Sequence, residues 1–174
     1  MNAPLADLVA CRLRDVADFP APGILFKDIA PLLADGAAFG AVVRDVASRH
    51  PRVDLVAGIE ARGFVLGAAV AHRLGVGFLP VRKAGKLPGS TLHADYDLEY
   101  GTARIEVQAD AVRAGARVVL VDDVLATGGT ALAAWQLLGR AGADVVAFET
   151  VVELSFLLGR ARLGARTVHS VLTV

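Results

Sequence analysis

The chain has 174 residues, which is enough for one domain with a sizeable hydrophobic core and short for two. Its 18 basic and 18 acidic side chains balance, so its charge gives no reason to expect binding to nucleic acid or to an acidic membrane surface. The single cysteine excludes an intrachain disulfide and fits a reducing cytoplasm, where we expect the protein to work.

The first part of the chain carries a helical pattern. Apolar side chains recur at helical spacing through residues 4–16, which predicts an amphipathic helix in which Cys11 is a buried small hydrophobic residue. Asp7 interrupts the only apolar run near the N-terminus, so we expect no signal peptide. The longest strongly apolar stretch, residues 63–71, is too short to span a bilayer, and no membrane association is expected.

A turn-rich segment follows. Proline and glycine block regular structure at residues 20–23, just before the apolar residues 24–26. Asp28 can then cap a short helical turn. Because these residues precede the regular alternation of strands and helices, we expect residues 1–34 to form a small N-terminal hood over the edge of the sheet.

Strands and helices alternate along the rest of the chain, beginning with a helix that includes Phe39 and ends at His50. The other expected helices span residues 61–74, 129–141 and 156–163, and the expected strands span residues 53–59, 77–81, 102–108, 117–121, 145–152 and 167–174. This order predicts a single α/β domain, residues 1–174, with a mostly parallel central sheet and helices on both faces.

The polar, glycine-rich residues 84–101 lack apolar anchors, and we expect them to form a mobile lid loop or a hairpin within such a loop. A carboxylate and a phenol near its end, Glu99 and Tyr100, could supply an acid to a substrate beneath it. A polar hairpin tip without chemistry is the alternative. His50 and His72 are expected on helix surfaces, and the histidines lack the spacing of metal ligands.

The stretch RVVLVDDVLATGGT, residues 117–130, is the most informative in the sequence. A buried strand ends in two carboxylates, Asp122 and Asp123, and a small-residue loop then opens a helix. Ligands of open α/β sheets bind at this edge, and the loop's amides with Thr127 and Thr130 suit a phosphate. The carboxylates would repel phosphate and suit a sugar diol or a hydrated cation. An ordinary strand–helix turn is the alternative.

Two more segments carry candidate anion ligands at the same edge of the sheet. Arg62 and the exposed amides of the turn at residues 58–63 could hold a second anion, although Glu60 could instead mark an ordinary helix start. Arg82, Lys83 and Lys86 follow the next core strand and could compensate a diphosphate, or form a solvated basic loop. Together these segments favour a sugar with phosphates at both ends. Residues 20–26 could provide an apolar wall for a flat base, or only a turn.

The motifs FPAPGILFKDI, EARGF, VRKAGKLPG, YDLEYG, VVLVDDVLATGGT and VVELSFLLGR occur in this order over nearly the whole chain. In this combination the chain resembles the adenine phosphoribosyltransferase family, which has the type I phosphoribosyltransferase fold. The resemblance implies transfer of ribose 5-phosphate from 5-phosphoribosyl 1-diphosphate (PRPP) to adenine, which gives AMP and diphosphate in purine salvage. It also implies Mg²⁺ that is carried with PRPP rather than held by protein ligands, and a cytoplasmic homodimer.

The resemblance assigns a role to each motif, with some diphosphate contacts made across the dimer interface. The implied residues are Ala126, Thr127, Gly128, Gly129 and Thr130 for the 5′-phosphate; Asp122 and Asp123 for the ribose; Ala61, Arg62, Arg82, Lys83 and Lys86 for the diphosphate; the main chain of Leu25 and Lys27 for the adenine edge; Phe26 and Leu157 for the two faces of the ring; and Glu99 with Tyr100 for acid–base catalysis.

The sequence departs from the family pattern at two places, and two other interpretations of the function remain open. Lys27 replaces an arginine of some relatives, which should matter little for a main-chain contact. Phe156 and Leu158 make the last motif more apolar than in some relatives, so a neighbour could replace Leu157 as the stacking residue. A phosphoribosyltransferase for a 6-oxopurine is the second reading of the function, and a PRPP-sensing regulator without catalysis is the third.

Overall fold

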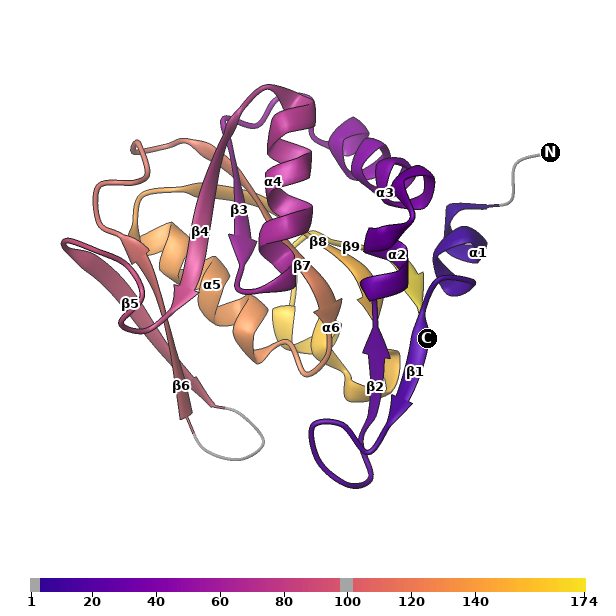
Figure 1. Ribbon diagram of the computed structural model, residues 1–174. Coiled ribbons are helices and arrows are strands. Elements are labelled where there is room, and N and C mark those ends of the chain that lie inside the picture. Colours follow the sequence, from indigo (N-terminus) through magenta and orange to yellow (C-terminus); the bar gives the residue numbers. More distant parts are fainter. Residues whose placement is uncertain (1–3, 98–101) are drawn as a thin grey trace.

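The computed structural model describes residues 4–97 and 102–174 (Figure 1). These residues form a seven-stranded sheet in the order β5-β6-β4-β3-β7-β8-β9. Its strands are β3 (Leu55–Ile59), β4 (Gly77–Lys83), β5 (Thr91–Asp97), β6 (Thr102–Gln108), β7 (Arg117–Leu125), β8 (Asp144–Glu153) and β9 (Val168–Thr173). The sheet is parallel from β4 to β9, while β6 runs antiparallel to both β4 and β5. The prediction of a mostly parallel sheet is confirmed.

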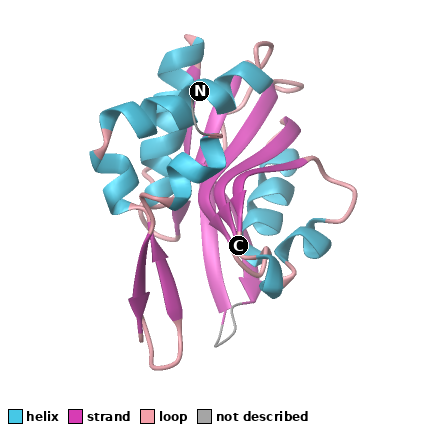
Figure 2. Ribbon diagram, turned by 90° about the vertical axis from the view of Figure 1, so that its right-hand side faces the viewer, coloured by secondary structure: helices cyan, strands magenta, loops and turns pink. Residues whose placement is uncertain are grey.

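Helices cover both faces of this sheet, as predicted (Figure 2). On one face lie α2 (Ala30–Ala34), α3 (Gly36–Arg49) and α4 (Arg62–Leu74), and on the other lie α5 (Gly129–Arg140) and α6 (Gly159–Leu163). Alternate residues of β7 enter two separate cores: Val119 and Val121 pack under α3 and α4, whereas Val118 and Leu120 pack against α5. Burial on both faces explains why this strand has a continuous apolar sequence. Within the described residues, no helix combines the length and apolarity that a membrane span requires.

The N-terminal segment corrects the prediction of one helix over residues 4–16. Helix α1 (Leu5–Ala10) is short, and the chain then forms β1 (Arg14–Ala17), which pairs antiparallel with β2 (Leu25–Asp28) in a separate two-stranded ribbon. Ion pairs between the two strands, Arg14 with Asp28 at 2.5 Å and Lys27 with Asp15 at 2.7 Å, support the ribbon. These partners are distant in sequence, so the helical spacing was misleading. Cys11 follows α1 and is exposed, not buried as predicted.

Two further predictions need correction. Residues 91–97 are not loop: they form β5, whose Leu92, Ala94 and Tyr96 pack toward the core while His93 and Asp95 are exposed. This alternation agrees with the hairpin alternative. His50 is not a surface residue but only 8% exposed, because its Nε2 lies 2.5 Å from the fully buried carboxylate of Glu149 on β8.

Candidate active site

A cavity of about 440 Å³ lies at the carboxyl ends of β3, β4 and β7. Figure 1 shows these strand ends at the edge of the sheet that faces the β1–β2 ribbon. Most of the residues predicted for the site line it together. They are Leu25, Phe26 and Lys27 from β2; Ala61 and Arg62 at the start of α4; Lys83 at the end of β4; Asp122 and Asp123 from β7; and Ala126, Thr130 and Leu157.

Residues 126–130, which the sequence predicts to bind phosphate and which are called the phosphate loop below, surround a smaller adjoining cavity of about 70 Å³. Gly128 has φ 77° and is the residue before α5, a backbone conformation that favours glycine. In the described part of the chain, no side chain caps the first turn of α5, whereas Asp35 caps α3 by accepting hydrogen bonds from the amides of Ala37 and Ala38. The amides of the phosphate loop and of the α5 N-terminus are therefore available to an anion.

Asp122 and Asp123 lie on β7 itself, because the strand extends to Leu125 instead of ending at Val121 as predicted. The Oδ1 atom of Asp122 accepts a hydrogen bond of 2.9 Å from the Asp123 amide. Burial and the adjacent charge of Asp123 raise the pKa of Asp122 well above its usual value. Carboxyl oxygens at this position can accept hydrogen bonds from sugar hydroxyls.

Arg62 contacts both the carboxyl pair and Phe26 of the apolar wall. Its Nε lies 2.9 Å from Oδ2 of Asp123, and its guanidinium carbon lies 4.8 Å from the ring centre of Phe26. The Oδ2 atom of Asp123 is buried and accepts no hydrogen bond from any described residue, so the ion pair leaves its acceptor capacity unused. Gly63 allows this arrangement, because a methyl group there would lie 2.8 Å from the Val121 carbonyl oxygen and 3.0 Å from Oδ1 of Asp122.

Glu60 contacts all three residues of the basic cluster Arg82, Lys83 and Lys86, two of them through their charged groups and Lys83 through its amide. Its carboxylate lies 2.9 Å from Lys86 Nζ and 3.3 Å from Arg82 Nη2, and it accepts a 2.9 Å hydrogen bond from the Lys83 amide. Burial alone would raise its pKa, but these hydrogen bonds outweigh burial and lower the pKa of Glu60 to about 2. Among the predicted cations, Lys83 lines the cavity, whereas Arg82 and Lys86 are turned toward Glu60. The sequence showed Glu60 only as a possible helix-start residue and did not indicate this role.

The apolar wall of the cavity is formed by β2 and by the turn after β8. The Lys27 ammonium pairs with Asp15 of the ribbon, and Lys27 is also one of the residues that line the cavity. Leu157 lines the cavity, whereas its neighbours Phe156 and Leu158 are 69% and 70% exposed. This arrangement favours Leu157 over its neighbours as the stacking residue.

Six further residues line the cavity without having been assigned a role from the sequence: Ile24, Ile59, Glu60, Tyr96, Val124 and Leu154. Tyr96 could have been found from the alternation of apolar and polar residues in β5. The others sit next to predicted residues and carry no separate sequence signal. The predicted acid–base pair, Glu99 and Tyr100, lies outside the described residues.

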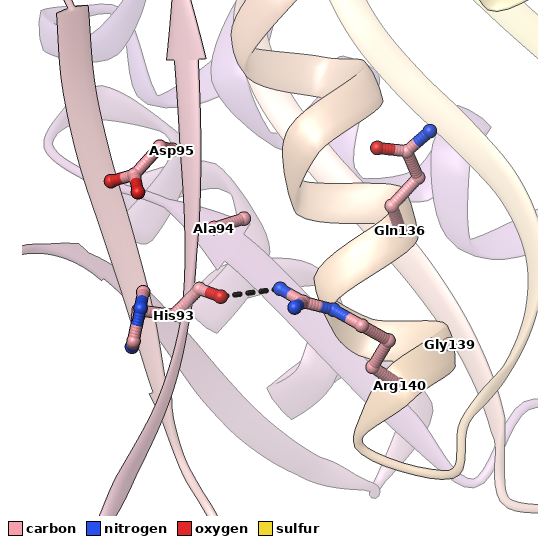
Figure 3. A pocket seen from close by; sticks show the side chains of 6 residues that line it. All are labelled: His93, Ala94, Asp95, Gln136, Gly139 and Arg140. Atoms are coloured by element: carbon pink, nitrogen blue, oxygen red, sulfur yellow. Dashed lines mark hydrogen bonds between the residues drawn. The ribbon is translucent and has the colours of Figure 1, made fainter.

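A different hollow, of about 670 Å³, lies between β5 and α5 (Figure 3) and contains none of the predicted site residues. It is lined by His93, Ala94, Asp95, Gln136, Gly139 and Arg140. The Arg140 guanidinium donates a hydrogen bond to the main-chain carbonyl of His93 and thus attaches the β5–β6 hairpin to α5.

Comparison with known proteins agrees with the geometry at the strand ends. The family described as phosphoribosyl transferase domain matches residues 33–162. An adenine phosphoribosyltransferase from Streptomyces galbus is 62% identical over 164 residues, which cover 92% of this chain and 90% of the relative. This chain belongs to the adenine phosphoribosyltransferase family. The resemblance inferred from the sequence motifs is confirmed.

Solved adenine phosphoribosyltransferases share the fold. The structure from Rhodothermus marinus has a TM-score of 0.94 at 46% identity and covers 99% of this chain and 100% of its own. The structure from Saccharomyces cerevisiae, a complex with D-2,5-dideoxy-2,5-imino-altritol 1,6-bisphosphate and adenine, has a TM-score of 0.90 at 39% identity and covers 97% of this chain and 98% of its own. The predicted type I phosphoribosyltransferase fold is therefore confirmed.

Proposed function

We propose that this chain transfers the 5-phosphoribosyl group of PRPP to adenine, releasing diphosphate and forming AMP for purine salvage. The observation that carries the proposal is the convergence of three features on one cavity. These features are an uncapped helix start behind a glycine loop, a carboxyl pair, and an apolar wall with main-chain groups. The adenine in the solved Saccharomyces cerevisiae relative supports the choice of base.

Each part of the cavity then has one task. The phosphate loop binds the 5′-phosphate, and Asp122 with Asp123 binds the ribose hydroxyls. Ala61, Arg62 and Lys83 face the diphosphate. Arg82 and Lys86, which contact Glu60, bind the diphosphate either of the same subunit or across a homodimer interface. Main-chain groups of Leu25 and Lys27 read the adenine edge, while Phe26 and Leu157 stack on its faces. These assignments rest on position in the cavity and on the family motifs.

The chemistry requires charge compensation, orientation and exclusion of water. As diphosphate leaves C1, the sugar becomes cationic, and an adenine nitrogen attacks it from the apolar side of the cavity. Cations near the leaving group compensate its charge, and a covered cavity keeps water from hydrolysing the same sugar. We propose Glu99, with Tyr100, as the group that exchanges a proton with the purine.

Magnesium carried with PRPP fits these residues better than a dedicated protein site. Within residues 4–97 and 102–174, no cluster of three or more His, Cys, Asp or Glu side chains could hold a metal ion. When bound, Mg²⁺ would neutralise charge on the diphosphate.

We also propose that residues 1–34 act as a hood over the base and that residues 84–101 act as the lid, in one domain of a cytoplasmic homodimer. The proposal of a hood is supported by the β1–β2 ribbon, because Leu25–Lys27 on β2 line the cavity. The proposal of a lid is supported by β5, because Tyr96 of this strand lines the same cavity.

A spectrophotometric assay with PRPP, Mg²⁺ and one base at a time tests the function. We expect turnover with adenine and little with hypoxanthine, guanine or xanthine, because a 6-oxo group reverses the donor and acceptor pattern that the main chain must match. If turnover occurred only with a 6-oxopurine, that base would replace adenine as the proposed substrate. Binding of PRPP without release of diphosphate with any base would indicate a regulator instead of an enzyme.

A further inference from the structure

One short segment contacts both the apolar wall and the phosphate loop. It comprises residues 154–160, here called the bracket, and includes the 3-10 turn η1 (Ser155–Leu157) and the first residues of α6. Leu154 and Leu157 of the bracket line the wall of the cavity. Gly159, two residues further on, lies against the phosphate loop. A displacement of the bracket would therefore move the two parts of the site relative to each other.

The bracket and the phosphate loop meet backbone to backbone at two glycines. A methyl group added to Gly128 would lie 2.6 Å from the carbonyl oxygen of Gly159. A methyl group added to Gly159 would overlap the carbonyl oxygen of Ala126 and lie 3.0 Å from the Gly128 amide nitrogen. Gly159 does not have a positive φ, so close contact, and not backbone conformation, requires glycine there.

Arg160 fixes the end of the bracket to the sheet. Its Nε and Nη2 donate to the two carboxylate oxygens of Glu153 at 2.9 and 2.5 Å, and Nη1 donates to the Val168 carbonyl oxygen at 2.8 Å. Nη2 also donates to the Ser170 hydroxyl at 2.7 Å. The Glu153 side chain is only 7% exposed and that of Arg160 is 48% exposed, so the carboxylate side of this bidentate ion pair is shielded from water. The start of α6 is thereby held to both β8 and β9.

We propose that Gly159 and Arg160 are positioning residues, which set the distance between the base wall and the phosphate loop. The inference rests on the proposed function, because these two parts must hold the two ends of one reacting assembly. Neither residue lines the cavity. Gly159 acts by packing against the backbone of Gly128, and Arg160 acts by holding Gly159 in place. The phosphate loop is thus held from outside by a segment that follows it by about thirty residues in the sequence.

The first test is Gly159→Ala, with Gly139→Ala as the control. Gly139 lies on the surface of α5 with open space where a methyl group would be added. We expect the Kd of PRPP, measured by calorimetry, to rise on the order of 10- to 100-fold in Gly159→Ala, since a displacement of about 1 Å can cost this much. Adenine binding to the free protein should change less, and Gly139→Ala should match the wild type in both.

A folded Gly159→Ala protein whose PRPP affinity stays within about twofold of the wild type would overturn the proposal. Equal losses of PRPP and adenine binding, together with a lower Tm, would do the same, because they indicate a general packing defect. The binding readout keeps this test separate from the proposed function. If the wild type binds PRPP but does not use adenine, the function fails while the positioning role is still measured.

Arg160 provides a second test that does not introduce a steric clash. Arg160→Met should lower kcat/KM for PRPP by about 10-fold, and Arg160→Lys should recover part of this loss because it keeps the charge but loses the fork geometry. Arg162→Met is the matched control, since Arg162 is an exposed residue of the same helix. An effect of Arg160→Met on Tm alone, with unchanged kinetics below the transition, would show that Arg160 contributes only to stability.

Discussion

The Arg62 guanidinium lies 2.9 Å from the Asp123 carboxylate and 4.8 Å from the centre of the Phe26 ring. One side chain therefore spans the region between the apolar wall and the carboxyl pair. A diphosphate that enters this region offers Arg62 a more highly charged partner than Asp123 does. Binding of PRPP should therefore draw Arg62 away from Asp123 and leave that carboxylate to the ribose.

Replacement of Arg62 should weaken PRPP binding specifically. Arg62→Gln should raise the Kd of PRPP by about 10-fold or more, because a charge-assisted contact to the diphosphate is lost. The Tm should fall as well, because the change leaves the Asp123 carboxylate, which is 7% exposed, without its ion pair, and the affinities are therefore compared below the unfolding transition. Calorimetric titration with PRPP measures the effect, and Arg44→Gln on the outer surface of α3 is the control. Equal affinity in the two variants would remove Arg62 from the diphosphate site.

Glu60 gives a prediction about acid stability. Its pKa of about 2 lies below the ordinary 4.5, so its contacts stabilise the folded chain fully above about pH 4.5 and are lost as the pH falls toward 2. Glu60→Gln should therefore be less stable than the wild type near pH 7, by about 2 kcal/mol. Urea unfolding at a series of pH values should show this difference shrink below pH 4.5. A difference that is constant with pH would contradict the assignment.

Asp122 should matter more for the sugar than for the base. Asp122→Asn keeps the shape of the side chain but replaces one accepting carboxyl oxygen with an amide group, which donates. We expect the Kd of PRPP to rise by about 10-fold and the Kd of adenine to change much less. Loss of both affinities to the same extent would instead point to a disturbed fold.

The predicted acid–base role of Glu99 is testable by kinetics. Glu99→Gln should lower kcat by about 100-fold, which is typical for the loss of a general acid or base, while the Kd of PRPP stays nearly unchanged. Asp95→Asn is a suitable control, because Asp95 is an exposed residue of β5 that pairs with Arg104. Unchanged turnover in Glu99→Gln would show that another group transfers the proton.

The sequence was sufficient where local pattern decides structure. Residues 117–130 predicted the strand, the carboxyl pair and the glycine loop, because a buried parallel strand and a helix start both have short-range signatures. The shared edge of the sheet then followed from the α/β alternation, since parallel strands end on the same side. For the same reason Arg62 and Lys83 were correctly expected near Asp122.

Contacts between distant residues could not be predicted in this way. Glu60 accepts a hydrogen bond from the Lys83 amide, and His50 contacts Glu149 at a separation of 99 residues. No period or motif encodes either pair. The wrong prediction of a helix at Arg14–Ala17 has a similar cause, because the pairing of this strand with β2 overrides the local helical spacing. The contact between Gly128 and Gly159 is a third example: each glycine was visible, but their proximity was not.

The pairing of the strands also has a consequence for motion. β7 is paired on both sides over Val118–Val121, with β3 and β8, whereas the register between β4 and β6 covers two residue pairs, Arg82↔Glu106 and Lys83↔Ile105. Amide hydrogens of β7 should therefore exchange with solvent only on global unfolding, and those of β5 should exchange through local opening of the hairpin. The carboxyl pair thus directly follows the doubly paired part of β7, while Tyr96 reaches the same cavity from β5, the outermost strand on that side of the sheet.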